Sequence, residues 1–169
     1  AVTAAARVLD TAYDIPVSIK WPNDLLSDGK KLGGVLVEKD SHQRVVLISM
    51  GLNVHSQPKD WPEENRKTSI SLSMIKNEDW QRDLLLAQCG TTWETLWETS
   101  MQDIGETIRG YWKRYSITLD KNVSLYRNGK EIHGVTRGID ELGRLRFIAE
   151  DGNQYHLLVE EVQKLRVLE

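Results

Sequence analysis

The sequence has 169 residues, 40% of them hydrophobic and 28% charged, which is ordinary for a folded globular protein of one domain or of a domain with a small appendage. A net charge of −3, from 22 basic and 25 acidic residues, argues against a large surface for binding nucleic acid. The single cysteine excludes an intramolecular disulfide and fits a cytoplasmic protein, and no apolar run reaches the roughly 18 residues that a membrane span needs.

The first third of the chain predicts one helix followed by an antiparallel meander. Apolar residues at helical spacing predict a helix over 1–13. Strands are expected at 17–21, at 34–39 and, as a buried strand, at 45–54, with a loop or tight hairpin around the turn dipeptide Asp28-Gly29. Three strands joined by short turns make an antiparallel sheet.

The middle of the chain predicts a long loop and two helices. Residues 55–68 are polar and form a surface loop of a length that is often functional. Asn77 is expected to cap a helix that begins near Glu78, and a second helix is expected over 101–115. The predicted core face of the first of these helices consists of Trp80, Leu84, Ala87, Trp93 and Leu96.

The pattern changes after Ser116 to about five short strands separated by turn dipeptides such as Asn128-Gly129, the strongest short hairpin signal. Close-spaced strands of this kind predict a small barrel. We therefore expect two domains, 1–118 and 119–169.

The stretch IKWPNDLLSDGKKLGGVLVE concentrates side chains suited to a ligand. Lys31 can bind a carboxylate or phosphate, and Asn23 offers both a donor and an acceptor. Gly33 and Gly34 would let a ligand lie on the backbone, while Asp24 could orient an amine or help to hold a metal. The plain alternative is a hairpin with surface lysines, but the Trp-Pro-Asn-Asp run has no evident turn or core purpose. The pattern therefore favours a small anionic or mixed-anhydride ligand.

Several segments together resemble the biotin protein ligases, enzymes that attach biotin to carboxylases. KWPNDLL followed by KKLGGVLVE is similar to the central signature of that family, ISMGLNV to its Gly-x-Asn strand, KTSIS to its Thr-Ser block, and HGVTRGIDELGRLRF to the start of its C-terminal barrel. The resemblance covers nearly the whole chain. It implies an α/β (α+β) fold, in which part of a class II synthetase-like mixed sheet with helices precedes a small SH3-like β-barrel.

The same resemblance implies a two-step, ATP-dependent ligation. Biotin and ATP are the substrates, biotinyl-adenylate is the intermediate, Mg²⁺ assists, and a lysine of a biotin carboxyl carrier domain receives the biotin. It also leaves room for a homodimer formed through the sheet.

The resemblance assigns a role to each matching residue. Lys31 would hold the biotin carboxylate and the adenylate phosphate. Lys20 begins the motif and could equally be a surface lysine, and Gly51 could simply ease strand packing. The assigned residues are Lys31 and Asp24 for catalysis, with Asp24 and Asn23 beside the adenylate and the incoming amine, Lys20 in the same motif, Gly33 and Gly34 as the floor of the biotin pocket, and Gly51 and Asn53 beside the nucleotide.

The sequence departs from the family pattern in two regions. The family's Gly- and Arg-rich biotin loop has no counterpart here, nor has the DNA-binding module of some relatives, so we expect a fragment whose isolated chain is an incomplete enzyme and binds biotin and ATP poorly. The family's Ser-Gly-Glu appears as Val159-Glu160-Glu161. Two alternatives stay open: a non-catalytic relative that docks carrier domains or another chain, and an adaptor that binds peptides through its barrel.

Overall fold

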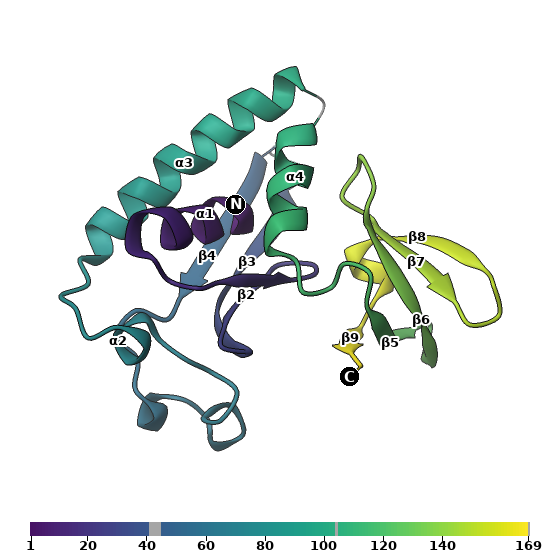
Figure 1. Cartoon of the computed structure of the whole chain (residues 1–169), viewed down its shortest axis with the longest axis horizontal. Helices are drawn as coiled ribbons and strands as arrows, with labels where there is room; N and C mark the ends of the chain where they lie inside the picture. Colours follow the sequence, from purple (N-terminus) through teal and green to yellow (C-terminus); the bar gives the residue numbers. More distant parts are fainter. Residues whose placement is uncertain (41–44, 104, 169) are drawn as a thin grey trace. The chain divides into compact units, whose positions relative to one another are not determined.

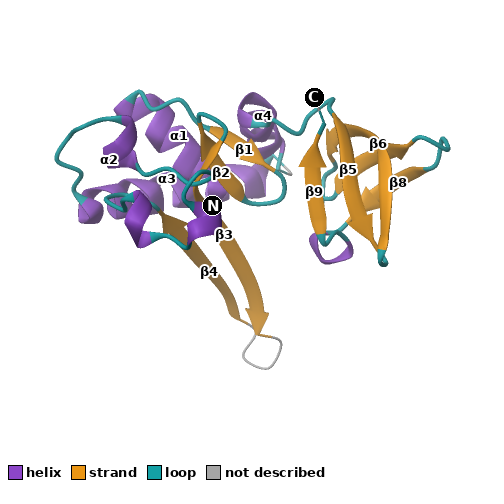
Figure 2. Ribbon diagram, turned by 90° about the horizontal axis from the view of Figure 1, so that it is seen from below, coloured by secondary structure: helices purple, strands orange, loops and turns teal. Residues whose placement is uncertain are grey.

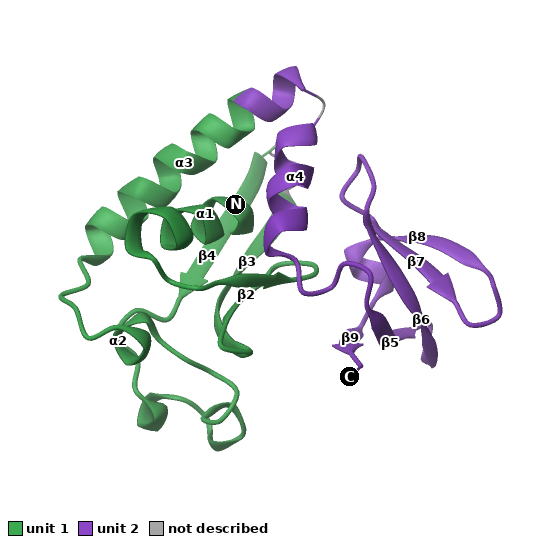
Figure 3. Cartoon of the chain, in the orientation of Figure 1, with its two compact units in different colours: residues 1–98 green, residues 99–169 purple. Residues whose placement is uncertain are grey.

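The computed structural model describes residues 1–40, 45–103 and 105–168, and the chain divides into two compact units, residues 1–98 and residues 99–169 (Figure 3). The boundary between these units falls inside a helix. The predicted boundary near residue 118 marks the place where helices give way to strands, and as a domain boundary it stays a prediction.

The first unit contains a four-stranded antiparallel sheet in the order β1-β2-β3-β4, with α1 packed against β1 and β2 (Figure 1). Its elements are α1 (Val2–Tyr13), β1 (Ser18–Lys20), β2 (Asp24–Ser27), β3 (Lys30–Asp40), β4 (Val45–Leu52), two 3₁₀ turns (Pro58–Asp60 and Glu63–Asn65), α2 (Leu72–Ile75) and the greater part of α3 (Arg82–Gln102). The predicted meander is therefore present, and it is extended by β2, which the sequence pattern left as part of a loop or hairpin.

The core of this unit lies between α1 and the short strands. Small and branched side chains of α1, among them Ala6 and Leu9, are fully buried, as are Ile19 on β1 and Leu32 on β3. Helix α1 covers β1 and β2 and so supports the turn between them and the start of β3. These parts of the chain carry most of the predicted ligand-binding residues.

The distal half of the β3–β4 hairpin contradicts the prediction of a buried strand at 45–54. Figure 2 shows this half extending beyond the helices of its unit. Val46 and Leu47 on β4 are 55% and 56% exposed, and Val37 on β3 is 58% exposed. The apolar composition predicted burial, but among the described residues of the first unit no element covers these side chains.

Two further predictions are corrected in the first unit. Trp21 is 4% exposed and residues 21–23 form the turn between β1 and β2, so the Trp-Pro-Asn-Asp run does serve both the core and a turn. The long helix begins at Arg82, not near Glu78, and its buried side chains are Leu85, Cys89 and Leu96, so the predicted face was misplaced at most positions.

The second unit contains α4 (Glu106–Tyr115) and a five-stranded antiparallel sheet in the order β8-β7-β6-β5-β9. The strands are β5 (Asn122–Arg127), β6 (Lys130–Ile139), β7 (Leu145–Ala149), β8 (Gln154–Leu157) and β9 (Lys164–Val167), with a 3₁₀ turn at Val159–Glu161. Inward side chains such as Val123, Leu125 and Phe147 are at most 1% exposed. The expected α+β class and SH3-like sheet are confirmed, although β8 and β9 do not pair with each other within the described residues, so the barrel is open.

Candidate functional site

A cavity of about 570 Å³ opens on the first sheet where β2, β3 and the end of β4 meet the loop that follows β4. Seven of the eight residues predicted for the site line it. These are Asn23, Asp24, Lys31, Gly33, Gly34, Gly51 and Asn53. The eighth, Lys20, is not among the lining residues, although it lies directly opposite Asp24 in the β1–β2 register.

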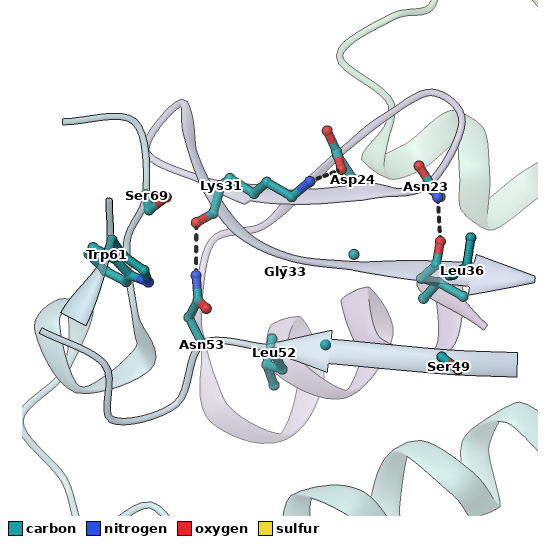
Figure 4. Close-up of a pocket in the computed structure, with 13 residues that line it drawn as sticks. Asn23, Asp24, Lys31, Gly33, Leu36, Ser49, Leu52, Asn53, Trp61 and Ser69 are labelled. Carbon is teal, nitrogen blue, oxygen red and sulfur yellow. Dashed lines mark hydrogen bonds and ion pairs between the residues drawn. The ribbon is translucent and has the colours of Figure 1, made fainter. Parts of the chain in front are cut away.

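Lys31 and Asp24 form an ion pair at the cavity wall (Figure 4). Their side-chain atoms Nζ and Oδ1 are 2.5 Å apart, and the two side chains are 52% and 31% exposed. An ion pair this accessible to water is held weakly, so an arriving anion can compete with Asp24 for the lysine ammonium group. The geometry thus provides a positive charge that is positioned yet available.

The three glycines that line the cavity differ in what a side chain at their position would meet. A methyl group at Gly33 would lie 2.4 Å from the carbonyl oxygen of Gly51, a distance that backbone atoms cannot accommodate. A methyl group at Gly34 would lie 3.3 Å from the carbonyl oxygen of Asn23. At Gly51 it would meet nothing within 4 Å. Strand packing therefore requires glycine at position 33. Gly51 instead leaves open space in the cavity. This favours the interpretation that Gly51 makes room for a ligand over the interpretation that it only eases the packing of the strands.

The two asparagines of the site make hydrogen bonds within the protein. Asn23 donates from Nδ2 to the carbonyl oxygen of Val35, and the amide of Val35 donates to the carbonyl oxygen of Asn23 at 3.1 Å, which ties the β1–β2 turn to β3. Asn53 donates from Nδ2 to the carbonyl oxygens of Lys31 at 3.3 Å and Ile70 at 3.2 Å. Both side chains therefore shape the wall that surrounds Lys31.

Sequence reasoning missed the part of the wall that comes from the loop after β4. Trp61 and Ser69 line the cavity from this loop, and Figure 4 shows them on the side of Lys31 away from Asp24. The length and polarity of 55–68 indicated a functional loop, but no local pattern distinguished Trp61 from the core tryptophans. Val35, Leu36, Ser49 and Leu52 complete the lining.

Neither a metal cluster nor a membrane span is evident in the part of the chain that the structure describes. No three His, Cys, Asp or Glu side chains there are grouped so that they could hold a metal ion. None of the helices described there has the length and apolarity to cross a bilayer.

Glu161, the residue that matches the end of the family's Ser-Gly-Glu, is engaged inside the second unit. Its carboxylate accepts hydrogen bonds from the amide of Leu158 at 2.9 Å and from Nη2 of Arg127 at 2.8 Å, and these bonds hold the pKa of the carboxyl below its usual value. In the described structure Glu161 therefore fixes the turn before β9.

Comparison with known proteins agrees with this geometry. The model of the biotin/lipoate A/B protein ligase family matches residues 1–55, the segment that carries Asn23, Asp24, Lys31 and the glycines. The chain is 30% identical over 155 residues to the bifunctional ligase/repressor BirA of Bacillus subtilis (strain 168), an alignment that covers 90% of this chain and 48% of the relative. This chain is therefore similar to biotin protein ligases over most of its length.

Two further members of the biotin protein ligase family extend the comparison. The biotin–[acetyl-CoA-carboxylase] ligase of Paracoccus denitrificans is 28% identical over 145 residues, covering 82% of this chain and 59% of the relative. The biotin protein ligase of Aquifex aeolicus in complex with biotin and ATP superposes with a TM-score of 0.82 at 25% identity, covering 98% of this chain and 68% of that one. The chain spans about half the length of the curated relatives that it matches.

Proposed function

We propose that this chain carries one side of the active site of an ATP-dependent biotin protein ligase, which makes biotinyl-adenylate and transfers the biotin to a lysine of a carboxyl carrier domain. The observation that carries the proposal is the position of Lys31. Its ammonium group projects along the cavity wall above a glycine floor, half exposed and paired with a carboxylate that an anion can displace.

In the first step a carboxylate oxygen of biotin attacks the α-phosphorus of ATP, and pyrophosphate leaves. Both reactants are anionic, so the barrier includes the repulsion between them, and a fixed cation beside the reacting atoms lowers it. Lys31 supplies that cation. Gly34 and Gly51, which lie opposite each other in the β3–β4 register, leave room for the substrate to lie directly against the strands.

In the second step the acceptor amine attacks the carbonyl carbon of the mixed anhydride, and AMP leaves. Once Lys31 is attracted to the ligand phosphate, the carboxylate of Asp24 becomes free to accept a hydrogen bond from the incoming amine. The roles assigned to Asn23 and Asn53 beside the nucleotide stay predictions, as does any role for Lys20.

Mg²⁺ would bind chiefly through the phosphates of ATP, because that ion keeps water and substrate oxygens as most of its ligands. Among the described residues that line the cavity, Asp24 is the carboxylate available to it. The ion would neutralise phosphate charge beside Lys31.

The carrier domain as acceptor, a homodimer formed through the sheet and a cytoplasmic location belong to the same proposal. The relative from Paracoccus denitrificans is named for acetyl-CoA carboxylase, whose biotin carrier is the natural substrate class for such an enzyme. Strand β4 is an edge of the four-stranded sheet and is the place where a second copy could pair.

The test is pyrophosphate release from ATP in the presence of biotin, measured on the intact protein. Replacing Lys31→Ala should slow release by about 30- to 1000-fold, equivalent to about 2–4 kcal/mol, because a charge-assisted contact to the reacting anion is lost. Lys20→Ala should have a smaller effect. Lys30→Ala, the neighbouring lysine outside the cavity lining, serves as the control and should behave as wild type.

Equal release by Lys31→Ala and the wild type would refute the assignment of Lys31. Absence of release from the wild type, combined with retained binding of a carrier domain, would favour the non-catalytic docking module instead.

A further inference from the structure

A short segment of the loop after β4 runs parallel to β3 at Lys31. The amide of Lys31 donates to the carbonyl oxygen of Thr68 at 2.7 Å, and the amide of Ile70 donates to the carbonyl oxygen of Lys31 at 3.0 Å. Lys31 and Ser69 thereby form an isolated parallel bridge. Two main-chain hydrogen bonds thus attach the part of the cavity wall that contains Ser69 to Lys31, whose side chain supplies the positive charge of the cavity.

Asn53 reinforces this attachment from the end of β4. Its Nδ2 donates to the carbonyl oxygens of Lys31 and Ile70, one on each side of the parallel bridge (Figure 4 shows the bond to Lys31). Its own main chain is fixed, because its amide donates to the carbonyl oxygen of Leu32 at 2.8 Å and its carbonyl accepts from the amide of Leu72 at 2.9 Å. Leu32 and Leu72 are both fully buried, so Asn53 is anchored in the core.

We propose that Asn53 is a positioning residue that fixes Lys31 relative to the Ser69 wall of the cavity, and that its effect on catalysis passes through Lys31. A side-chain amide has two N–H hydrogens, and here both point to main-chain carbonyls. The nitrogen therefore has no hydrogen left to donate to a ligand. The catalytic part of this inference rests on the proposed ligase function, but the structural part does not.

The proposal predicts a particular order of variants at this position. Asn53→Ala removes the two donated bonds, and water can partly replace them because Asn53 and Ser69 are half-buried. Asn53→Asp keeps the size and shape of the side chain. It replaces the amide nitrogen that donates to two carbonyl oxygens with a negatively charged oxygen, which repels both of them. Asn53→Asp should therefore loosen the segment more than Asn53→Ala, the opposite of what loss of volume alone would give.

Amide hydrogen exchange of the whole protein tests the structural part without any need for activity. Exchange over residues 68–72 and at Lys31 should rise about 10-fold or more in Asn53→Asp and about 3-fold in Asn53→Ala, because local opening becomes more frequent. The matched control is Asn65→Ala, an exposed asparagine of the same loop, which should exchange as wild type. Exchange in β5–β9 reports whether the rest of the fold is intact. Unchanged exchange over 68–72 in Asn53→Asp, with β5–β9 intact, would overturn the proposal.

A double-mutant cycle on pyrophosphate release tests the catalytic part. If Asn53 acts through Lys31, Asn53→Ala should slow the wild type about 10-fold and should slow Lys31→Ala by less than about 2-fold. Effects that multiply would show that Asn53 contacts the substrate independently and would overturn this part of the inference. Absence of release from the wild type would count against the ligase function, and the exchange measurements would still decide the bridging role.

Discussion

In the first sheet β2 turns into β3 through Asp28-Gly29, and in the second β5 turns into β6 through Asn128-Gly129. All four residues have positive φ, from 49° to 74°, as the tight hairpin turns require. Each sheet also contains a glycine, Gly33 or Gly134, whose Cβ would collide with a carbonyl oxygen of the next strand. Up to this point the two sheets follow the same local rules.

The two sheets differ in whether the space beside their glycines is filled and whether their charged side chains are fully paired. Opposite Gly34 in the first sheet stands Gly51, which leaves open space in the cavity beside a half-exposed ion pair. In the second sheet the space beside Gly134 is filled by Phe147, which is 1% exposed. The charge of Asp140 there is satisfied by four groups of its own unit: the ring of His156, the side chain and amide of Arg144, and the amide of Leu142. The first sheet thus leaves charged side chains available to a ligand, whereas the charged side chains of the second sheet contribute to the stability of its own unit.

The largest effects are expected when one glycine of each sheet is replaced by alanine. Gly134→Ala should lower the free energy of unfolding by about 3 kcal/mol or more, because its methyl group would lie 2.1 Å from the carbonyl oxygen of Ile148 and 2.7 Å from Cζ of Phe147. Gly51→Ala should change it by less than about 1 kcal/mol yet weaken ligand binding, because its methyl group enters open cavity space. Urea unfolding and titration with biotinyl-adenylate measure the two effects. Equal destabilisation by both variants would show that the contrast is wrong.

The Asp140 cluster should give the next largest effect. Burial by itself raises the pKa of the Asp140 carboxyl, but hydrogen bonds from His156 and from the amide and side chain of Arg144 outweigh it and lower the pKa from 3.8 to about 2. Because the folded-state pKa is depressed, the stabilisation is complete above pH of about 4 and is lost as the pH falls toward 2. Asp140→Asn should therefore lower the free energy of unfolding by about 1–2 kcal/mol at neutral pH.

The same difference should shrink as unfolding is measured at successively lower pH, because the wild-type carboxyl then becomes neutral like the amide of the variant. Asp120→Asn is a suitable control, since Asp120 pairs with Arg137 at 3.0 Å but both side chains are at least half exposed. A difference between Asp140→Asn and the wild type that did not vary with pH would mean that the charge of Asp140 contributes nothing.

The smallest effect should come from the two turns and should be equal in both sheets. Gly29→Ala and Gly129→Ala each place a side chain at positive φ with nothing within 4 Å, so the cost is one of backbone conformation alone, about 1 kcal/mol. Thermal unfolding of the two variants measures it. A clearly larger cost in one turn would show that the turns are not equivalent.

Features set by neighbouring residues in the sequence were predicted well. The turn dipeptides, helix α1 and the change to short strands after Ser116 were all confirmed, because Asp-Gly and Asn-Gly favour their turns without help from distant groups. The grouping of Lys31, Asp24, Gly33 and Gly34 was also expected, because they lie close together in one motif of the sequence, and the β2–β3 hairpin places them side by side.

Features set by distant contacts could not be predicted in the same way. Trp80 is buried ahead of α3, where its ring lies 5.1 Å from that of Tyr13 and its Nε1 donates to the carbonyl oxygen of Lys76, so the periodicity that included it placed the helix too early. Ser69 reaches the cavity through the bridge at Lys31, and Trp61 lines the cavity from the same loop, which no local pattern reveals. The exposure of β4 likewise depends on what packs on it, which composition cannot specify.

The position of Trp61 also gives this protein an optical reporter of its own site. Indole emission shifts with the polarity of its surroundings, and Trp61 is a half-buried indole at the cavity, whereas Trp21, Trp80 and Trp112 are at most 4% exposed. A ligand that fills the cavity removes water from Trp61 and leaves the environment of those three unchanged. The difference in fluorescence between the wild type and Trp61→Phe would therefore follow occupancy of the cavity in real time, without a label and before any chemical step.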